Sequence, residues 1–209
     1  GLRHTASING NVIPGKTITG TAAIRLNEFW YPSTIRRRQE TDESGRTRTI
    51  DEQIRGFAAA RTFTTSLNFA TTVYGISQTK IAGFEGFRHT VRPSLGVSFS
   101  PDFSDEQWGY FREVEGDTTG RTYSIFEGGI VGGPTAGRSQ SLNLSINNSL
   151  EAKRVRRDTS GVKKEENVRL IDNLSLSTNY NFAAERNKLG NLTANMRSNI
   201  LNKISVNVN

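Results

Sequence analysis

The chain has 209 residues, of which only 34% are hydrophobic, and this share is low for a soluble protein with a thick buried core. Cysteine is absent, which excludes disulfide frameworks and thiolate metal sites. The formal net charge is +7, but acidic residues accompany the basic ones in the connecting segments. This mixture indicates solvated loops rather than a continuous basic stripe for nucleic acid.

Apolar and polar residues alternate with period two along most of the chain, and this alternation predicts a series of strands. In chain order the predicted strands are residues 2–12, 18–30, 57–76, 87–99, 122–130, 141–153, 168–184 and 192–200. The pattern is clearest in 141–153, where Leu142 and Leu144 lie on one face and Asn143 and Asn147 on the other. No apolar run approaches the about 18 residues that a spanning helix needs, whereas a barrel strand needs only about 9–11.

The predicted connections fall into two alternating classes. Short turns lie near residues 13–16, 78–83, 132–137 and 185–190, and long charged loops lie at residues 31–55, 101–121 and 156–167. This segregation is typical of an up-and-down outer-membrane barrel whose short turns face the periplasm. Aromatic residues near both classes, such as Trp30 and Tyr180, agree with two interfacial girdles.

These patterns predict an all-β fold, namely an antiparallel up-and-down transmembrane β-barrel segment with about eight to nine strands of a larger barrel. We expect residues 1–209 to be one outer-membrane fragment with no separate second domain. The chain begins without Met and ends within an alternating run, as expected of a fragment. A soluble β-sandwich is the alternative, since its strands also alternate and its apolar face packs against a second sheet.

The motifs of catalysis and cofactor binding are missing. Residues 132–139 (GGPTAGRS) resemble a phosphate loop, but a strand is predicted after them where such a loop must open a helix. His4 and His89 lie within alternating strands, without carboxylates at metal-site or catalytic spacing. We therefore expect no catalytic residue, no metal and no cofactor.

Two groups of residues are candidates for binding. The first is a basic cluster predicted to contact lipid phosphates at the barrel rim, namely Arg36, Arg37 and Arg38. The alternative is a solvated loop neutralised by nearby acidic residues, namely Glu40, Asp42 and Glu43. Polar side chains of the predicted strands are expected to line a hydrated lumen that accepts sugar hydroxyls, or else to fill an inert interior. These are Asn143, Asn147, Glu151, Lys153, Asn173 and Asn179.

Eight short strings follow one another along the chain: NEFWY (27–31), RGFAAAR (55–61), TVYG (72–75), FRHTVRPS (87–94), FSPDF (99–103), YSIFEGG (123–129), NNSLEAK (147–153) and LIDNLS (170–175). In this order they resemble a divergent branch of the LptD family of lipopolysaccharide-assembly proteins. The resemblance covers nearly the whole chain. The chain shows no recognisable jelly-roll segment, no assignable gate strand and no cysteine. The gate and lipid-entry residues of the family are therefore not assigned to positions of this chain.

The resemblance implies a large barrel of the bacterial outer membrane that delivers lipopolysaccharide to the outer leaflet without bond chemistry. It also implies contact with membrane lipid, a lipoprotein plug of the LptE type and a periplasmic Lpt bridge as partners. Two alternatives are another large outer-membrane barrel, such as a protein translocon or a receptor-type transporter, and a soluble sugar-binding β-sandwich.

Overall fold

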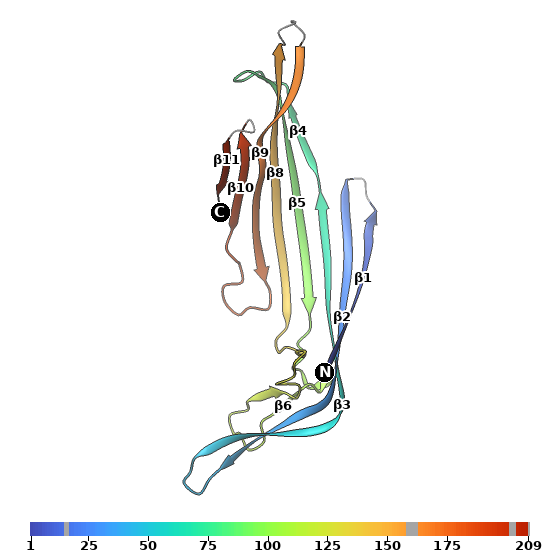
Figure 1. Ribbon diagram of the computed structural model, residues 1–209, viewed down its shortest axis with the longest axis vertical. Coiled ribbons are helices and arrows are strands. Elements are labelled where there is room, and N and C mark those ends of the chain that lie inside the picture. The colour runs from blue at the N-terminus through green and yellow to red at the C-terminus, as the bar shows by residue number, and fades with distance from the viewer. Residues whose placement is uncertain (15–16, 158–162, 201–203, 209) are drawn as a thin grey trace. The chain divides into compact units, whose positions relative to one another are not determined.

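The computed structural model describes residues 1–14, 17–157, 163–200 and 204–208, and the regular secondary structure of these residues is almost entirely β-strand (Figure 1). The one helix among them is a 3-10 turn, η1, at Glu106–Trp108. The strands of the described residues are β1 (Leu2–Pro14), β2 (Ile18–Thr41), β3 (Thr47–Thr71), β4 (Val73–Ser77), β5 (Phe84–Ser100), β6 (Phe111–Glu113), β7 (Thr122–Ser124), β8 (Ser139–Arg157), β9 (Lys163–Asn181), β10 (Thr193–Ile200) and β11 (Ile204–Val208).

Nine of these strands form one antiparallel sheet in the order β1-β2-β3-β5-β8-β9-β10-β11, with β4 also paired to β5. Only Thr72 separates β3 from β4, so the two follow each other along β5. The all-β, antiparallel, up-and-down prediction is confirmed. Among the described residues the sheet is open, because its order starts at β1 and ends at β11.

No helix in the described part of the chain is long and apolar enough to cross a membrane.

The chain forms two compact units, which are described separately. Unit 1 comprises Gly1–Asn9, Ala23–Ser66 and Ser98–Gln140, and unit 2 comprises Gly10–Ala22, Leu67–Val97 and Ser141–Asn209. Several strands, β2 among them, contribute residues to both units.

In unit 2 the register of β8 and β9 separates an apolar face from a polar face. Leu142 lies opposite Tyr180 and Ile146 opposite Leu176, whereas Asn143 lies opposite Asn179. Because side chains alternate across a strand, these pairs occupy opposite faces of the sheet. Large apolar side chains of this unit remain exposed to between 41% and 53%, namely Val12, Ile18, Leu67, Val73, Leu144 and Ile146. A sandwich would cover such side chains with a second sheet.

A register shift between β8 and β9 explains why Asp172 breaks the alternation of β9. Asn148 lies opposite Leu174, but Leu150 lies opposite Ile171, so β9 has one more residue than β8 between these pairs. Such a bulge lets the following apolar residues return to their original face.

Unit 1 corrects the prediction of a long loop at residues 31–55. β2 continues to Thr41 and β3 begins at Thr47, so this stretch is a strand hairpin with a tight turn between. The Asp42 carboxylate accepts hydrogen bonds from the backbone N–H groups of Ser44 and Arg46 and closes the turn. The hairpin lacks apolar alternation because polar residues occupy both faces, so a hydrophobic pattern does not reveal it.

The predicted strand at residues 122–130 is wrong. Only β7 forms there, and it pairs with β6 in a separate two-stranded sheet. Residues 124–132 continue through turns, with Gly128 and Gly132 at positive φ. The predicted loop at 101–121 and turn at 132–137 therefore belong to one folded connection between β5 and β8. We call residues 101–138 the docked segment.

Losing one strand changes the predicted segregation of connections, because every connection after it moves to the other end of the strands. In unit 2, β8 ends and β9 begins at the end of the strands where β1 ends and β2 begins and where β4 ends and β5 begins. The long connection predicted at residues 156–167 is thus not opposite the predicted short turns at 13–16 and 78–83. Its central part, residues 158–162, lies outside the described residues, and the rest is strand, since β8 ends at Arg157 and β9 begins at Lys163.

The core of unit 1 lies between the hairpin and the docked segment. It consists of Phe29 and Tyr31 from β2, Ala60 from β3, and Phe126 from the docked segment. Tyr31 and Phe126 have ring centroids 5.3 Å apart, and the Tyr31 hydroxyl donates a hydrogen bond to the Gly132 carbonyl. The docked segment is therefore packed as part of this unit.

Ala60 has no exposed surface, so enlarging it tests this core. We expect Ala60→Leu to destabilise the protein by about 1–3 kcal/mol, because a packed site must distort to accept extra methylene groups. Thermal unfolding of the full-length protein in detergent, followed by circular dichroism, measures the change. Ala59→Leu adds the same volume on the opposite face and is the matched control. Equal losses for both variants would contradict the assignment of Ala60 to the core.

Candidate functional site

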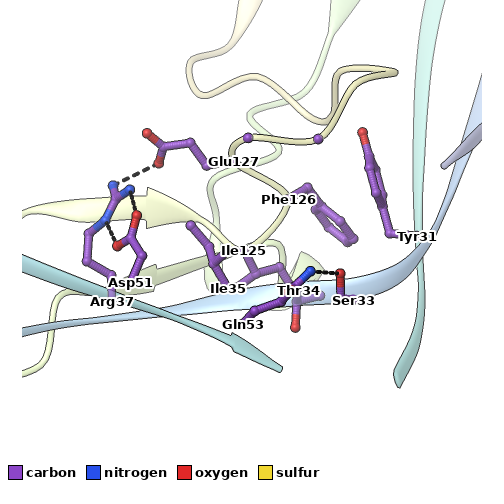
Figure 2. A pocket seen from close by; sticks show the side chains of 12 residues that line it. Tyr31, Ser33, Thr34, Ile35, Arg37, Asp51, Gln53, Ile125, Phe126 and Glu127 are labelled. Carbon is purple, nitrogen blue, oxygen red and sulfur yellow. Dashed lines mark hydrogen bonds and ion pairs between the residues drawn. The ribbon is translucent and has the colours of Figure 1, made fainter. Parts of the chain in front are cut away.

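A cavity of about 480 Å³ with a mixed polar and apolar lining lies between the β2–β3 hairpin and the docked segment (Figure 2). Alternation along β2 places Tyr31, Ser33, Ile35 and Arg37 on the face that borders it. The full lining is Tyr31, Ser33, Thr34, Ile35, Arg37, Asp51, Gln53, Ile125, Phe126, Glu127, Gly128 and Gly129.

Residues of β3 also line this cavity, and the alternation of β3 changes near Gly56. Asp51 and Gln53 reach Arg37 and Ser33, and Gln53 Nε2 donates to Ser33 Oγ at 2.9 Å. Further along β3 the core residue on this side is the even-numbered Ala60, so the strand changes its alternation between Gln53 and Ala60. Gly56 lies in this interval at φ 154°, a conformation that residues with a side chain rarely adopt.

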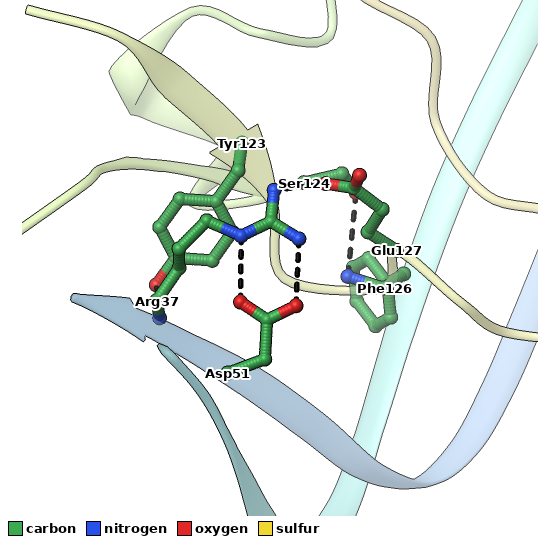
Figure 3. A network of polar contacts seen from close by, with 6 residues as sticks. All are labelled: Arg37, Asp51, Tyr123, Ser124, Phe126 and Glu127. Atoms are coloured by element: carbon green, nitrogen blue, oxygen red, sulfur yellow. Dashed lines mark hydrogen bonds and ion pairs between the residues drawn. The ribbon is translucent and has the colours of Figure 1, made fainter. Parts of the chain in front are cut away.

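Arg37 is the centre of the polar network at the cavity wall (Figure 3). Its Nε and Nη2 atoms donate to the two oxygens of Asp51 at 2.6 and 2.8 Å, and Nη1 donates to Glu127 Oε2 at 2.9 Å. The guanidinium carbon also lies 5.3 Å from the centroid of the Tyr123 ring. One side chain thus joins both strands of the hairpin to the docked segment by charge-assisted hydrogen bonds.

These contacts stabilise the charged forms of both partners. Hydrogen bonding from Arg37 lowers the pKa of Asp51, and hydrogen bonding to Asp51 is the main cause that raises the pKa of Arg37. Because the pKa of Asp51 is lower when folded, its contribution to stability is present above the ordinary aspartate pKa. It is lost as the pH falls through the lowered value.

Backbone bonds attach the docked segment to both edges of the hairpin. On the β2 edge, Ile35 N–H donates to the Ile125 carbonyl at 2.9 Å and Gln39 N–H donates to the Glu115 carbonyl at 2.8 Å. On the β3 edge, the Tyr110 hydroxyl accepts from Arg61 N–H at 2.8 Å and donates to the Arg61 carbonyl at 3.1 Å. These bonds satisfy backbone groups that an unpaired edge leaves open.

The three arginines predicted to bind lipid phosphate lie on β2, and each already has an acidic partner. Arg36 pairs with Glu115 at 2.7 Å and Arg38 pairs with Glu40 at 2.9 Å, both with about half of the side chain exposed. Arg37 is 20% exposed and pairs with two carboxylates. Arg37 is therefore held between the hairpin and the docked segment. Arg36, which also pairs with a residue of the docked segment, and Arg38 keep about half of their side chains exposed.

The polar residues predicted on β8 and β9 share one face in unit 2, as the register requires. Asn143 lies opposite Asn179, and Asn147 lies opposite Ser175. Glu151 pairs with Arg88 and Arg169, Lys153 Nζ lies 2.8 Å from Glu165, and Asn173 lies opposite Arg197. Whether this face lines a lumen stays a prediction.

Sequence reasoning missed Asp51, Glu127 and Tyr110. The Asp42–Arg46 turn sets Arg37 opposite Asp51, so recognising that turn would have found the first pair. Glu127 is 90 positions from Arg37, and no local pattern connects them.

The cavity offers hydroxyl and amide groups, one paired arginine and two aromatic rings, Tyr31 and Phe126. Within the described residues no group of three or more His, Asp or Glu side chains is placed to hold a metal ion. Such a lining suits the binding of a polar, hydroxyl-rich group by hydrogen bonds and ring contact.

Arg37→Gln tests how the docked segment is held. Losing the ion pairs weakens the binding of the docked segment to the hairpin by about 1–3 kcal/mol. The lower end of this range applies where solvent screens the partly exposed carboxylates. We expect cleavage by chymotrypsin after Tyr123 and Phe126 in the full-length protein to become several-fold faster. Arg38→Gln removes the same charge from an exposed local pair and should leave the rate unchanged. An unaltered rate in Arg37→Gln would show that the other contacts of the segment, among them its backbone bonds and the Arg36–Glu115 ion pair, hold it without Arg37.

Comparison with known proteins relates the whole chain to one family. The family model described as "LptD protein" matches residues 1–209. Searches of the curated proteins and of the solved structures gave no match. Because the match covers all 209 residues and the structure has a long-stranded antiparallel sheet, the chain belongs to the LptD protein family.

Proposed function

We propose that this chain is part of an outer-membrane barrel that delivers lipopolysaccharide to the outer leaflet without making or breaking covalent bonds. The observation that carries the proposal is the family match over residues 1–209. Family association also supplies the proposed partners, which are lipopolysaccharide, an LptE-type lipoprotein and the periplasmic Lpt bridge.

The two faces of the sheet support a position in the membrane. Exposed aliphatic residues such as Leu144 and Ile146 suit contact with hydrocarbon, and the opposite face carries amides, hydroxyls and ion pairs. In this proposal the polar face lines an aqueous lumen. Its lining includes Asn143, Asn147, Glu151, Lys153, Asn173 and Asn179.

The hairpin supports a second part of the proposal. Arg36 and Arg38 are about half exposed, and among the described residues each pairs with one carboxylate, so they are the residues we propose for contact with lipid phosphates. Arg37 instead holds the docked segment against the hairpin.

Matched substitutions on neighbouring residues test the membrane position. Leu144→Arg places a charge on the apolar face, which costs about 2–4 kcal/mol near the middle of a bilayer. Ser145→Arg places the same charge on the polar face, where water solvates it. We expect Leu144→Arg to reduce the heat-modifiable folded form of the full-length protein in outer-membrane fractions, and Ser145→Arg to preserve it. Equal recovery of the two variants would remove the membrane assignment.

Depletion of the full-length protein tests the cargo. We expect newly made lipopolysaccharide to be lost from the cell surface and to accumulate before the outer leaflet, because no other route through the barrel remains. Surface labelling of lipopolysaccharide after depletion measures this. Unchanged surface lipopolysaccharide would overturn the transport proposal and leave the fold intact.

A further inference from the structure

The apolar face of unit 1 carries one pair of opposite charges beside a cavity. Along β2 the residues on this face are Ile24, Leu26, Glu28 and Trp30, and Arg61 of β3 pairs with Glu28 through Nε and Oε1 at 2.8 Å. Ile24 and Leu26 are 41% and 43% exposed. Charged residues on a lipid-facing surface are destabilising and rare, so this pair needs a physical reason.

The pair lies at a boundary between aromatic and aliphatic residues. Trp30 contacts His4 at 4.6 Å and Phe57 at 5.9 Å between ring centroids, one outward-facing position nearer the hairpin turn than Glu28. Leu26 and Ile24 follow on the other side. Aromatic belts mark the headgroup level of a membrane, so Glu28 and Arg61 lie where headgroups meet acyl chains.

Arg61 is held in place but keeps unused donors. Its backbone is bonded at both N–H and carbonyl to the Tyr110 hydroxyl, and its side chain is 78% exposed. Only Nε has a partner among the described residues, so the two terminal nitrogens, Nη1 and Nη2, are open. A guanidinium with both terminal nitrogens open presents a fork that matches two oxygens of a phosphate.

A cavity of about 380 Å³ lies beside this fork. Its lining includes His4, Leu26, Glu28, Arg61, Phe63 and Trp108. The charges of Glu28 and Arg61 cancel, so a purely anionic headgroup would set a phosphate beside a carboxylate with Arg61 alone to balance both negative charges. A headgroup that carries both a phosphate and an ammonium group matches both charges, and the ring of Trp30 adds favourable surroundings for the ammonium.

We propose that the apolar face of unit 1 binds a zwitterionic phospholipid headgroup, with the phosphate on Arg61 and the ammonium beside Glu28. The acyl chains then lie along Leu26 and Ile24. The inference rests on the membrane position in the proposed function, but it does not depend on the cargo.

The test uses the full-length protein in bilayers of equal phosphatidylethanolamine and phosphatidylglycerol, with co-purified lipid measured by native mass spectrometry. We expect the unmodified protein to retain phosphatidylethanolamine preferentially. Arg61→Gln should lower this retention by about tenfold or more, because tenfold is the factor expected for the loss of a single charge-assisted hydrogen bond and the fork makes two. Arg61→Lys keeps the charge without the fork and should be intermediate.

Glu28→Gln provides a result that a merely structural ion pair would not produce. Without the carboxylate, Arg61 is unbalanced, and the preference should move towards phosphatidylglycerol. Arg25→Gln removes a positive charge from the opposite face of β2 and should change nothing. The same lipid profile in the unmodified protein and Arg61→Gln, or an equal loss in Arg25→Gln, would overturn the proposal.

Flotation of the protein with the same bilayers separates the two proposals. Protein that floats but shows no dependence on Arg61 overturns only the lipid site. Protein that fails to float overturns the membrane position, and the lipid site with it.

Discussion

The register of the antiparallel ladder is the constraint on which the rest of this protein depends. Backbone hydrogen bonds pass from each strand to its neighbours, and alternate side chains then fall on opposite faces of the sheet. A slip of one residue would exchange those faces. In β9 the bulge beside Asp172 keeps Leu174 and Ile171 on the same face although the spacing between them is odd. The separation of an apolar from a polar face follows from this register.

Strands of unequal length create a second requirement, because a strand that outruns its neighbours leaves backbone groups without partners. β2 reaches Thr41, and the docked segment supplies carbonyl acceptors to the N–H groups of Ile35 and Gln39. The Glu115 N–H also donates to the Arg37 carbonyl. On β3, the Tyr110 hydroxyl acts as both acceptor and donor at Arg61. The connection between β5 and β8 therefore completes the hairpin edges and forms one wall of the cavity at Arg37.

The prediction from sequence worked best where the two faces of a strand differ in polarity. Residues 141–153 and 168–184 correspond to β8 and β9, because Leu and Ile alternate there with Asn and Ser. It failed at residues 31–55, where polar and charged residues occupy both sides of a hairpin. It also failed at residues 122–130, where Tyr123 and Ile125 alternate with polar residues as in a strand. There Tyr123 and Phe126 are instead buried by the packing of the docked segment.

The order of residues was enough to establish the fold class, most of the long strands and the family resemblance, since period-two alternation is a local property of the chain. The partners of Arg37 and Arg61 depend on folding. Asp51 comes opposite Arg37 through the hairpin turn, Glu127 comes from a segment 90 positions away, and Glu28 meets Arg61 across two strands. Contacts between distant segments are set by strand register and by the path of the connections, and the spacing of neighbouring residues predicts neither.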